Sequence, residues 1–309
     1  MKRDLRASID IGSNSVLLLI ADVTSGKFQE LSKQSHITSL GRELDKNKLF
    51  HQDSMQATYE ALEAYGLECD KFNIPREEVI ATGTEASRVS RNAADFFSKI
   101  KLELNINIQV ITSQAEAYFS TKGILFNSKF DSEIITIMDI GGASTELIKV
   151  NTKNFKILET ISMPLGAVRA TQWLEDDLFV QNLKKIFLEF RNEIDTFQSK
   201  TLYCVAGTVT SLGNMHLGNK EFVEDDVHGL VMKSEDIDSL FKKYSDYNPE
   251  MFLEAFPFLE KRSKSIRGGL HTVYHIVHRL LAKDITISTY GLRYGTILEG
   301  KIKQEFLHV

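Results

Sequence analysis

The alternation of apolar and polar positions along the first part of the chain predicts an α/β unit. Short apolar runs predict strands at residues 7–11, 16–23, 28–31, 79–82 and 106–111. Apolar residues spaced by three or four positions predict helices at residues 53–66, 86–100 and 114–125. Strands that alternate with helices in this way are typical of an α/β lobe.

A second α/β pattern follows a polar connector at residues 127–133. Apolar runs predict strands at residues 134–140, 145–150, 155–162, 202–206 and 284–288. Helical spacing predicts helices at residues 183–197, from 207 onward, at 234–246, at 264–282 and after 290. We therefore expect two domains, residues 1–125 and 126–309.

The two lobes begin with similar segments, residues 9–15 and 138–144. In each, a strand ends in Asp-Ile-Gly and a turn of small residues leads into a second apolar strand. Asp-x-Gly is a common turn sequence, so one copy would be weak evidence, whereas a copy at the start of each lobe favours a site. If the turns face one another, Asp10 and Asp139 would be available to hold a hydrated Mg²⁺. The backbone N–H groups of the turns would be available to bind phosphate oxygens.

Composition and charge narrow the possible classes of protein. With 42% hydrophobic and 26% charged residues, the chain is globular rather than disordered. A net charge of −5 leaves no overall basic field, which argues against a nucleic-acid partner. Cys69 and Cys204 lie in apolar segments, and we expect two buried thiols in a reducing cytosol. No apolar run approaches the ~18 residues of a membrane span, so we expect a cytoplasmic protein without a membrane partner.

Two polar clusters allow more than one interpretation. His271, His275 and His278 share helical spacing and could bind a transition metal. An amphipathic helix also explains them, and no nearby Cys or carboxylate completes a site, so we favour the helix. The basic run at residues 261–267 is either a solvated helix start or a docking track for a polyanion.

Further segments stand in a fixed order: Thr84-Glu85-Ala86-Ser87-Arg88, Ile111-Thr112-Ser113-Gln114-Ala115-Glu116-Ala117, Pro164-Leu165-Gly166-Ala167-Val168-Arg169, Ala206-Gly207-Thr208, His228-Gly229 and Gly291-Leu292-Arg293. With the two turns, they resemble the exopolyphosphatase / guanosine pentaphosphate phosphohydrolase (Ppx/GppA) family, in the actin, Hsp70 and sugar-kinase superfamily. The resemblance implies a two-lobed actin-like (ribonuclease H-like) ATPase fold with mixed central sheets and an interlobe cleft. It also implies that the last helix packs on the first lobe, a short form without extra C-terminal helical domains, and a homodimer.

The same resemblance implies Mg²⁺-dependent release of the terminal phosphate from polyphosphate, guanosine pentaphosphate or both. Glu116 would orient or deprotonate the attacking water, and Asp10, Asp139 and Glu146 would hold the metal. The expected phosphate-binding residues are Gly12, Ser13, Asn14, Ser15, Arg88, Gly141, Gly142, Ala143 and Ser144. The expected substrate track consists of Arg169, Arg262, Lys264 and Arg267.

The sequence departs from the family pattern at several positions. Leu17 stands where Arg or His is common, Ala143 replaces a common Gly, Lys264 replaces an Asp, and Tyr294 replaces a Glu. If the backbone at Ala143 needs a positive φ, its methyl group costs ~1 kcal/mol. Residues 113–115 also lack the Gly and the first Glu that usually precede the catalytic Glu. These departures bear on substrate choice and turnover more than on the class of reaction.

Two other classes of function remain open from the sequence. An ATP-dependent kinase of the same superfamily would have similar phosphate-binding turns, together with an adenosine pocket. A non-enzymatic sensor of nucleotides or alarmones is the other alternative. The sequence does not rank polyphosphate against guanosine pentaphosphate, because both present a terminal phosphoanhydride.

Overall fold

The structure, a computed structural model, describes residues 3–126, 128–130 and 132–308, and only the backbone of Lys261. The chain divides into two compact units. Unit 1 comprises Met1–Gly123 and Leu292–Val309, and unit 2 comprises Ile124–Gly291. The division falls two residues before the boundary expected between residues 125 and 126. Positions 127 and 131 of the polar connector lie outside the described residues.

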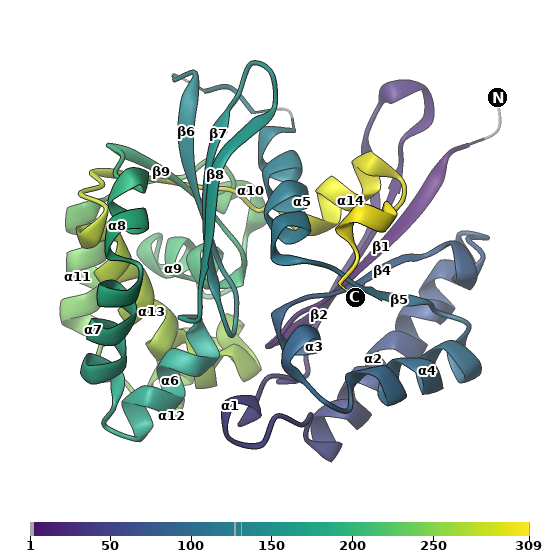
Figure 1. The fold of residues 1–309 in the computed structure, drawn as a ribbon, viewed down its shortest axis with the longest axis horizontal. Coiled ribbons are helices and arrows are strands. Elements are labelled where there is room, and N and C mark those ends of the chain that lie inside the picture. Colours follow the sequence, from purple (N-terminus) through teal and green to yellow (C-terminus); the bar gives the residue numbers. More distant parts are fainter. Residues whose placement is uncertain (1–2, 127, 131, 309) are drawn as a thin grey trace. The chain divides into compact units, whose positions relative to one another are not determined.

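Unit 1 is built on a five-stranded mixed sheet with the order β3-β2-β1-β4-β5 (Figure 1). Strand β1 is antiparallel to β2 and parallel to β4. The elements are β1 (Leu5–Ile11), β2 (Ser15–Asp22), β3 (Gln29–Ile37), α1 (Leu44–Asn47), α2 (Gln52–Lys71), β4 (Ile80–Gly83), α3 (Glu85–Val89), α4 (Ala93–Leu104), β5 (Ile108–Val110), α5 (Ser113–Leu125) and α14 (Leu292–Glu299), with short 3₁₀ turns at Thr24–Gly26, Arg76–Glu78 and Gln304–Phe306.

The side chains of β1 are divided between the two faces of this sheet. Ala7, Ile9 and Ile11 join the hydrophobic core under α2 and α4. Ser8 lies on the other face, where its Oγ is 2.6 Å from Oγ1 of Thr296 in α14. Since side chains alternate along a strand, Asp10 shares the α14 face with Ser8. The candidate carboxylate is therefore kept out of the larger core of unit 1.

Unit 2 contains a six-stranded mixed sheet with the order β10-β11-β9-β6-β7-β8. Read from the β8 edge, the first five strands repeat the order and the directions of the unit 1 sheet, and β10 adds an antiparallel edge. The elements are β6 (Ile134–Ile140), β7 (Thr145–Asn151), β8 (Lys156–Met163), α6 (Ala167–Glu175), α7 (Phe179–Glu189), α8 (Arg191–Ile194), β9 (Thr201–Val205), α9 (Gly207–His216), α10 (Glu224–Val227), β10 (Val231–Lys233), α11 (Ser234–Tyr244), α12 (Pro249–Ala255), α13 (Ser263–Arg279) and β11 (Asp284–Ile287), with 3₁₀ turns at Asp195–Phe197 and Pro257–Arg262.

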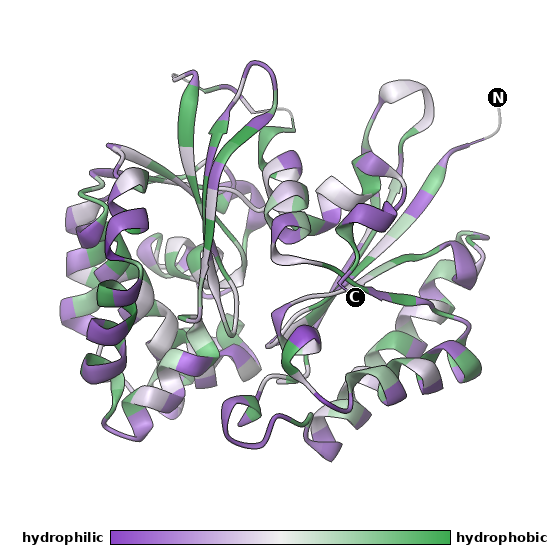
Figure 2. Ribbon diagram, viewed as in Figure 1, coloured by the Kyte–Doolittle hydropathy of each residue, from purple (hydrophilic) through white to green (hydrophobic). Residues whose placement is uncertain are grey.

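The repeated sheet confirms the expected α/β class with mixed sheets. The hydropathy pattern explains the layering, because the outer helices of unit 2 carry hydrophobic residues on one side and hydrophilic residues on the other (Figure 2). The core of unit 2 joins β6, β9 and β11 to α7, α9, α11 and α13. Among the described residues, no helix has the length and apolar character needed to cross a membrane.

The single helix expected at residues 86–100 is wrong, because the chain forms α3 and α4 with a break at Ser90. The break is explained by a contact with a distant segment of the chain. The backbone N–H of Phe50 donates to Ser90 Oγ at 3.2 Å and to Asn92 Oδ1 at 2.9 Å. Ser and Asn side chains that bind the backbone elsewhere compete with the helix. The helical spacing of apolar residues continues through the break, so the sequence pattern does not predict it.

The helix expected at residues 183–197 is also different in the structure. It begins earlier, at Phe179, and is interrupted at Phe190, whose ψ of 18° ends α7. A short α8 and a 3₁₀ turn follow. The hydrophobic spacing thus located a buried helical face correctly but did not locate the interruption.

The expected buried thiols are confirmed, since Cys69 and Cys204 are both free and fully buried. Burial raises the pKa of the Cys69 thiol to about 12. Such thiols are inert, because the reactive species is the thiolate.

The three histidines of α13 belong to an aromatic cluster rather than to a metal site. His271 Nε2 lies 3.3 Å from the Ser245 carbonyl oxygen, and His278 Nε2 lies 2.7 Å from Asp238 Oδ1. His275 packs between Phe179 and Tyr274, with ring centroids 5.6 and 5.1 Å away. In the described part of the chain, no group of three His, Cys, Asp or Glu side chains could hold a metal ion. This supports the amphipathic-helix interpretation.

We expect this cluster to make stability depend on pH. Burial and the neighbouring His271 and His278 lower the pKa of His275 to about 4, whereas the unfolded chain has the ordinary value of about 6.5. The folded state therefore favours the neutral ring, and its contribution is present above pH 6.5 and lost as the pH falls toward 4. We expect the free energy of unfolding to drop by about 1 kcal/mol over this interval, a discounted figure because the ring is partly exposed.

Urea denaturation from pH 7 to pH 4 measures this dependence. In His275→Gln the drop should shrink, while His308→Gln, at an exposed position, is the matched control. An unchanged pH profile in His275→Gln would assign the acid sensitivity to other groups.

Candidate functional site

Two hairpins of the same construction stand at equivalent places in the two sheets. Hairpin 1 (residues 9–17) joins β1 to β2, and hairpin 2 (residues 138–146) joins β6 to β7. Gly12 N–H donates to the Ser15 carbonyl at 2.9 Å, and Gly141 N–H donates to the Ser144 carbonyl at 3.0 Å. A Cβ at either glycine would lie 3.3 Å from that same serine oxygen, so both positions favour glycine.

A second glycine supports each hairpin from outside. Gly41 N–H donates to the Ser13 carbonyl at 2.7 Å, and a Cβ on Gly41 would lie 2.8 Å from Ser13 Cβ. In unit 2, a Cβ on Gly166 would lie 2.5 Å from the carbonyl carbon of Gly142. Backbone therefore packs directly against backbone at both turns.

Hairpin 2 is further held by α6, a helix that the hydrophobic spacing did not predict. The first amides of α6 donate to hairpin carbonyls, from Ala167 to Gly141 at 2.9 Å and from Val168 to Gly142 at 2.8 Å. The buried guanidinium of Arg169 donates to the Ala143 carbonyl. Arg169, expected on a substrate track, thus fixes the shape of the turn in this structure.

The carboxylates of Asp139 and Glu146 are brought together in unit 2. The two residues are directly paired across β6 and β7, so both side chains lie on one face of the sheet. Glu146 is 2% exposed, and Ser162 Oγ donates to its Oε1 at 2.7 Å. The equivalent pair in unit 1 is Asp10 and Leu17. Leu17, which stands where a basic residue is common, therefore lies directly across from Asp10.

This donor set fits Mg²⁺. Two carboxylates on adjacent strands repel one another unless a cation or a shared proton lies nearby. Mg²⁺ prefers oxygen ligands and usually takes only one or two carboxylates, with water and phosphate oxygens completing its shell. A pair of carboxylates, rather than a cage of three or more protein ligands, is compatible with this preference.

Arg88 and Glu116 are brought together in unit 1. Glu116 lies in the first turn of α5, which Thr112 caps by accepting the Ala115 N–H on its Oγ1 at 3.1 Å. Arg88 extends from α3, and its Nη2 lies 3.0 Å from Glu116 Oε2. Both side chains are largely buried, with 9% and 13% of their surfaces exposed. Arg88, expected to bind phosphate, holds the expected catalytic carboxylate in place here.

Arg262 lies against the start of α9. A Cβ on Gly207 would lie 2.0 Å from Arg262 Nη1, so the guanidinium occupies the space beside this glycine. Burial lowers the pKa of Arg262 to about 10. Among the described residues, no carboxylate lies within salt-bridge distance of its guanidinium. A cation in dense surroundings beside the N-terminus of a ten-residue helix favours an anion at this point.

The other two residues of the expected basic track point elsewhere. Arg267 Nε donates to the Ser245 carbonyl at 2.8 Å, and Lys264 is exposed on α13. The side chain of Lys261 lies outside the described residues. Within unit 2, Arg267 is thus bound to a backbone carbonyl, whereas Lys264 is exposed.

Backbone strain occurs at Ala206 rather than at Ala143. Ala206, just before α9, has φ 79° and ψ 170°, a region that is essentially restricted to glycine. Ala143 is not among the described residues with a positive φ. Its methyl group therefore does not carry the cost that a left-handed backbone would impose.

Tyr294, where a Glu was expected, is part of the unit 1 core. Its ring is fully buried and stacks on Phe28 at a centroid distance of 5.6 Å. Its hydroxyl accepts from Lys33 Nζ at 2.7 Å and donates to Glu30 Oε1 at 2.8 Å. The substitution joins α14 to β3.

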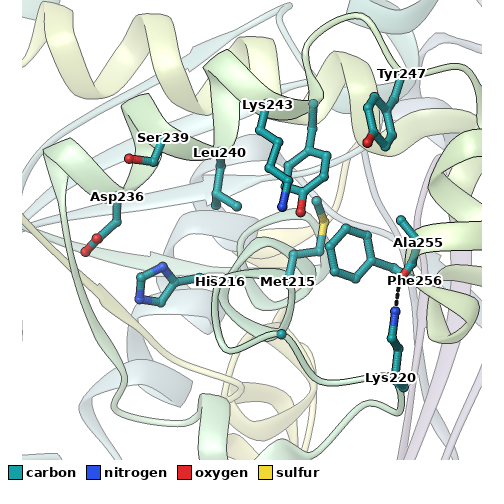
Figure 3. A pocket seen from close by; sticks show the side chains of 12 residues that line it. Met215, His216, Lys220, Asp236, Ser239, Leu240, Lys243, Tyr247, Ala255 and Phe256 are labelled. Carbon is teal, nitrogen blue, oxygen red and sulfur yellow. Dashed lines mark hydrogen bonds between the residues drawn. The ribbon is translucent and has the colours of Figure 1, made fainter.

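A cavity of about 500 Å³ lies at the C-terminal end of α9 (Figure 3). Arg262 lies at the other end of this helix, beside Gly207. The walls of the cavity come from the end of α9, from α11 and from the end of α12, and Lys220 on one side donates to the Ala255 carbonyl at 2.7 Å. None of the site residues expected from the sequence lines it. The cavity is therefore separate from the hairpins.

The family model described as the Ppx/GppA phosphatase family matches residues 19–304. A bifunctional 3-dehydroquinate synthase/phosphatase from Fusobacterium nucleatum is 30% identical over 96% of this chain and 46% of its own length. A guanosine-5'-triphosphate,3'-diphosphate pyrophosphatase from Vibrio campbellii is 30% identical over 96% of this chain and 59% of its own length. This chain thus spans about half the length of the curated relatives that it matches.

Solved structures support the same relationship. The Aquifex aeolicus member of the Ppx/GppA family has a TM-score of 0.77 and 27% identity over 96% of this chain and 97% of its own. An exopolyphosphatase from Cytophaga hutchinsonii has a TM-score of 0.85 over 97% of this chain and 99% of its own, but at 24% identity it shows the fold alone. These similarities confirm the expected resemblance and the actin-like fold.

Relief of the strain at Ala206 should stabilise the protein. Ala206→Gly removes a methyl group from a backbone region that costs about 1–3 kcal/mol for non-glycine residues, and the added freedom of the unfolded chain offsets about 0.5–1 kcal/mol. We expect the free energy of unfolding to rise by about 1 kcal/mol, measured by urea denaturation. Ala143→Gly is the control and should lower stability slightly, since no strain is relieved there. Equal effects of the two substitutions would contradict the assignment of strain.

Proposed function

Because the chain belongs to the Ppx/GppA phosphatase family, we propose that it is a hydrolase that releases the terminal phosphate from inorganic polyphosphate, guanosine pentaphosphate or both. One observation carries the proposal: each unit closes the same hairpin with a glycine and places an aspartate on the strand before it. Several relatives are guanosine-5'-triphosphate,3'-diphosphate pyrophosphatases, which supports a guanosine substrate with phosphate chains.

The hairpins and Arg262 are the groups that we assign to phosphate. The N–H groups of Gly12 and Gly141 close the turns, so the amides at the turn tips, residues 13–14 and 142–143, are the proposed donors to phosphate oxygens. Arg262 would pair with a further phosphate at the start of α9.

Asp139 and Glu146 are the residues that would hold Mg²⁺, and we assign the same role in unit 1 to Asp10. A magnesium ion there would neutralise the negative charge of the phosphate chain. The adjacent, partly buried carboxylates support this assignment because their mutual repulsion is relieved by a cation.

Glu116 is the proposed general base. Its carboxylate would accept a proton from a water molecule as the water oxygen forms a bond to the terminal phosphorus. The bond from phosphorus to the bridging oxygen breaks, and the shortened chain leaves with that electron pair. Orthophosphate is the second product. Arg88 fixes the orientation of the carboxylate through its 3.0 Å contact.

Phosphate release from polyphosphate, guanosine pentaphosphate and ATP, with and without Mg²⁺, tests the proposal. We expect release from one or both of the first two substrates in the presence of Mg²⁺. Transfer of phosphate from ATP to an acceptor would favour the kinase, and tight binding without turnover would favour the sensor.

Replacement of Glu116 should remove turnover while leaving substrate binding nearly unchanged. Glu116→Gln retains the size of the side chain but removes the basic charge, and phosphate is assigned to the turn amides and Arg262. We expect kcat to fall by ~10²-fold or more, equivalent to ~2.7 kcal/mol in the barrier, with a similar Kd for substrate. Glu63→Gln, on the exposed side of α2, is the matched control. A wild-type kcat in Glu116→Gln at saturating Mg²⁺ and substrate would require another base.

Replacement of Asp139 should act on metal binding instead. Asp139→Asn removes one charge of the carboxylate pair, so the Mg²⁺ concentration for half-maximal activity should rise by about tenfold. The melting temperature provides a second readout, since Mg²⁺ should raise it in the wild-type protein and less in the variant. Glu159→Gln, exposed on β8, is the control. An unchanged Mg²⁺ requirement together with an unchanged melting response would place the metal elsewhere.

A further inference from the structure

Arg88 is shared between two carboxylates, those of Glu116 and Glu85. The same nitrogen, Nη2, lies 3.0 Å from Glu116 Oε2 and 3.1 Å from Glu85 Oε2. The other terminal nitrogen, Nη1, donates to the Ile111 carbonyl at 2.8 Å. Glu85 and Arg88 are three residues apart in α3, the spacing at which helical side chains meet.

The cluster is fixed to the framework that also carries hairpin 1. Thr84, just before α3, donates its N–H to the Ile11 carbonyl at the end of β1, at 3.3 Å. Ile111 N–H donates to the Gly83 carbonyl at 3.0 Å. Backbone hydrogen bonds thus tie both ends of the cluster to β1 and β4, so its geometry is set by the sheet.

Because the three side chains are largely buried, the electrostatic interactions among their charges are strong. Their exposed fractions are 9% for Arg88, 13% for Glu116 and 22% for Glu85, so solvent screens the interactions only in part. One guanidinium and two carboxylates carry a formal charge of −1. The other charged group of α5, Lys122, pairs with Glu299 in α14.

A carboxylate that has an arginine to itself is a weak base. An adjacent guanidinium lowers the pKa of a carboxyl group by about 1–3 units. A general base with a lower pKa is less efficient at accepting a proton. A second carboxylate on the same guanidinium opposes that effect. It also holds the guanidinium in one orientation, which in turn orients the first carboxylate.

We propose that Glu85 is a positioning residue that acts through Arg88 to keep Glu116 both oriented and basic. This inference rests on the proposed function, because it takes Glu116 as the group that accepts the proton from water. Glu85 itself does not contact the substrate in this scheme.

The test compares Glu85→Gln with Glu85→Asp, and Glu103→Gln on α4 serves as a charge-matched control at an exposed position. In Glu85→Gln the negative charge is lost while the size is retained. We expect the acid limb of the kcat profile to move about one unit toward lower pH and the plateau to fall about threefold. KM should remain within about twofold. Glu85→Asp should restore the position of the acid limb at least in part.

A purely structural role predicts a different result. In that case Glu85→Gln would lower thermal stability, and the acid limb would stay at the wild-type pH. That outcome, or a plateau and acid limb equal to those of Glu103→Gln, would overturn the inference.

A direct titration separates this inference from the proposed function. The Glu116 carboxyl carbon, followed by NMR in the wild type and in Glu85→Gln, should titrate at lower pH in the variant whether or not the protein hydrolyses phosphoanhydrides. If Glu116→Gln turns over normally while this shift is present, the proposed base is wrong and the coupling is right. If the shift is absent, the coupling is wrong even where Glu116 is the base.

Discussion

The hydrogen bond from a glycine N–H to a serine carbonyl, made once in each unit, determines much of the candidate chemistry. It closes the turn and fixes the antiparallel register, so that the seventh residue after each aspartate lies directly across from it. In unit 2 that residue is Glu146, which creates a carboxylate pair. In unit 1 it is Leu17, which does not. Two units of one topology therefore carry unequal chemistry, and the cause is a single side chain at a position that the register selects.

The arginines of the candidate site illustrate how a folded chain uses buried cations. Arg88 and Arg169 are both largely buried, and each is bound to groups of its own unit: two carboxylates and a carbonyl for the first, the Ala143 carbonyl for the second. Such pairing compensates for the loss of hydration. Among the described residues, no carboxylate pairs with Arg262 in this way. The loss of hydration is therefore not compensated, and it lowers the pKa of the guanidinium. Of the arginines named from the sequence, Arg262 is the one whose surroundings most favour an external anion.

The departures from the family pattern have distinct structural consequences. Tyr294 fills the unit 1 core and satisfies its hydroxyl with Lys33 and Glu30, so it contributes to packing. Ala143 has no positive φ, whereas Ala206, the first residue of the Ala206-Gly207-Thr208 segment, has a φ of 79° and a strained backbone. A positive φ adds a cost for a methyl group, and the sign of φ depends on how the following helix meets the strand. Composition alone does not contain that information.

Hydrophobic periodicity and short motifs are local properties of a chain. They were sufficient to predict most of the strands, the two repeated turns, the buried cysteines and the family, but not α6, α10, α12 or β10. The contacts that these residues make follow from the tertiary structure. The break at Ser90 depends on a contact with Phe50, and α6 is held at its start by the carbonyls of hairpin 2. The grouping of Glu85 with Arg88 and Glu116 likewise depends on residues about 30 positions apart meeting where β4 and β5 end. Long-range contacts of this kind carry no periodic signal, and so they appear only when the chain is folded.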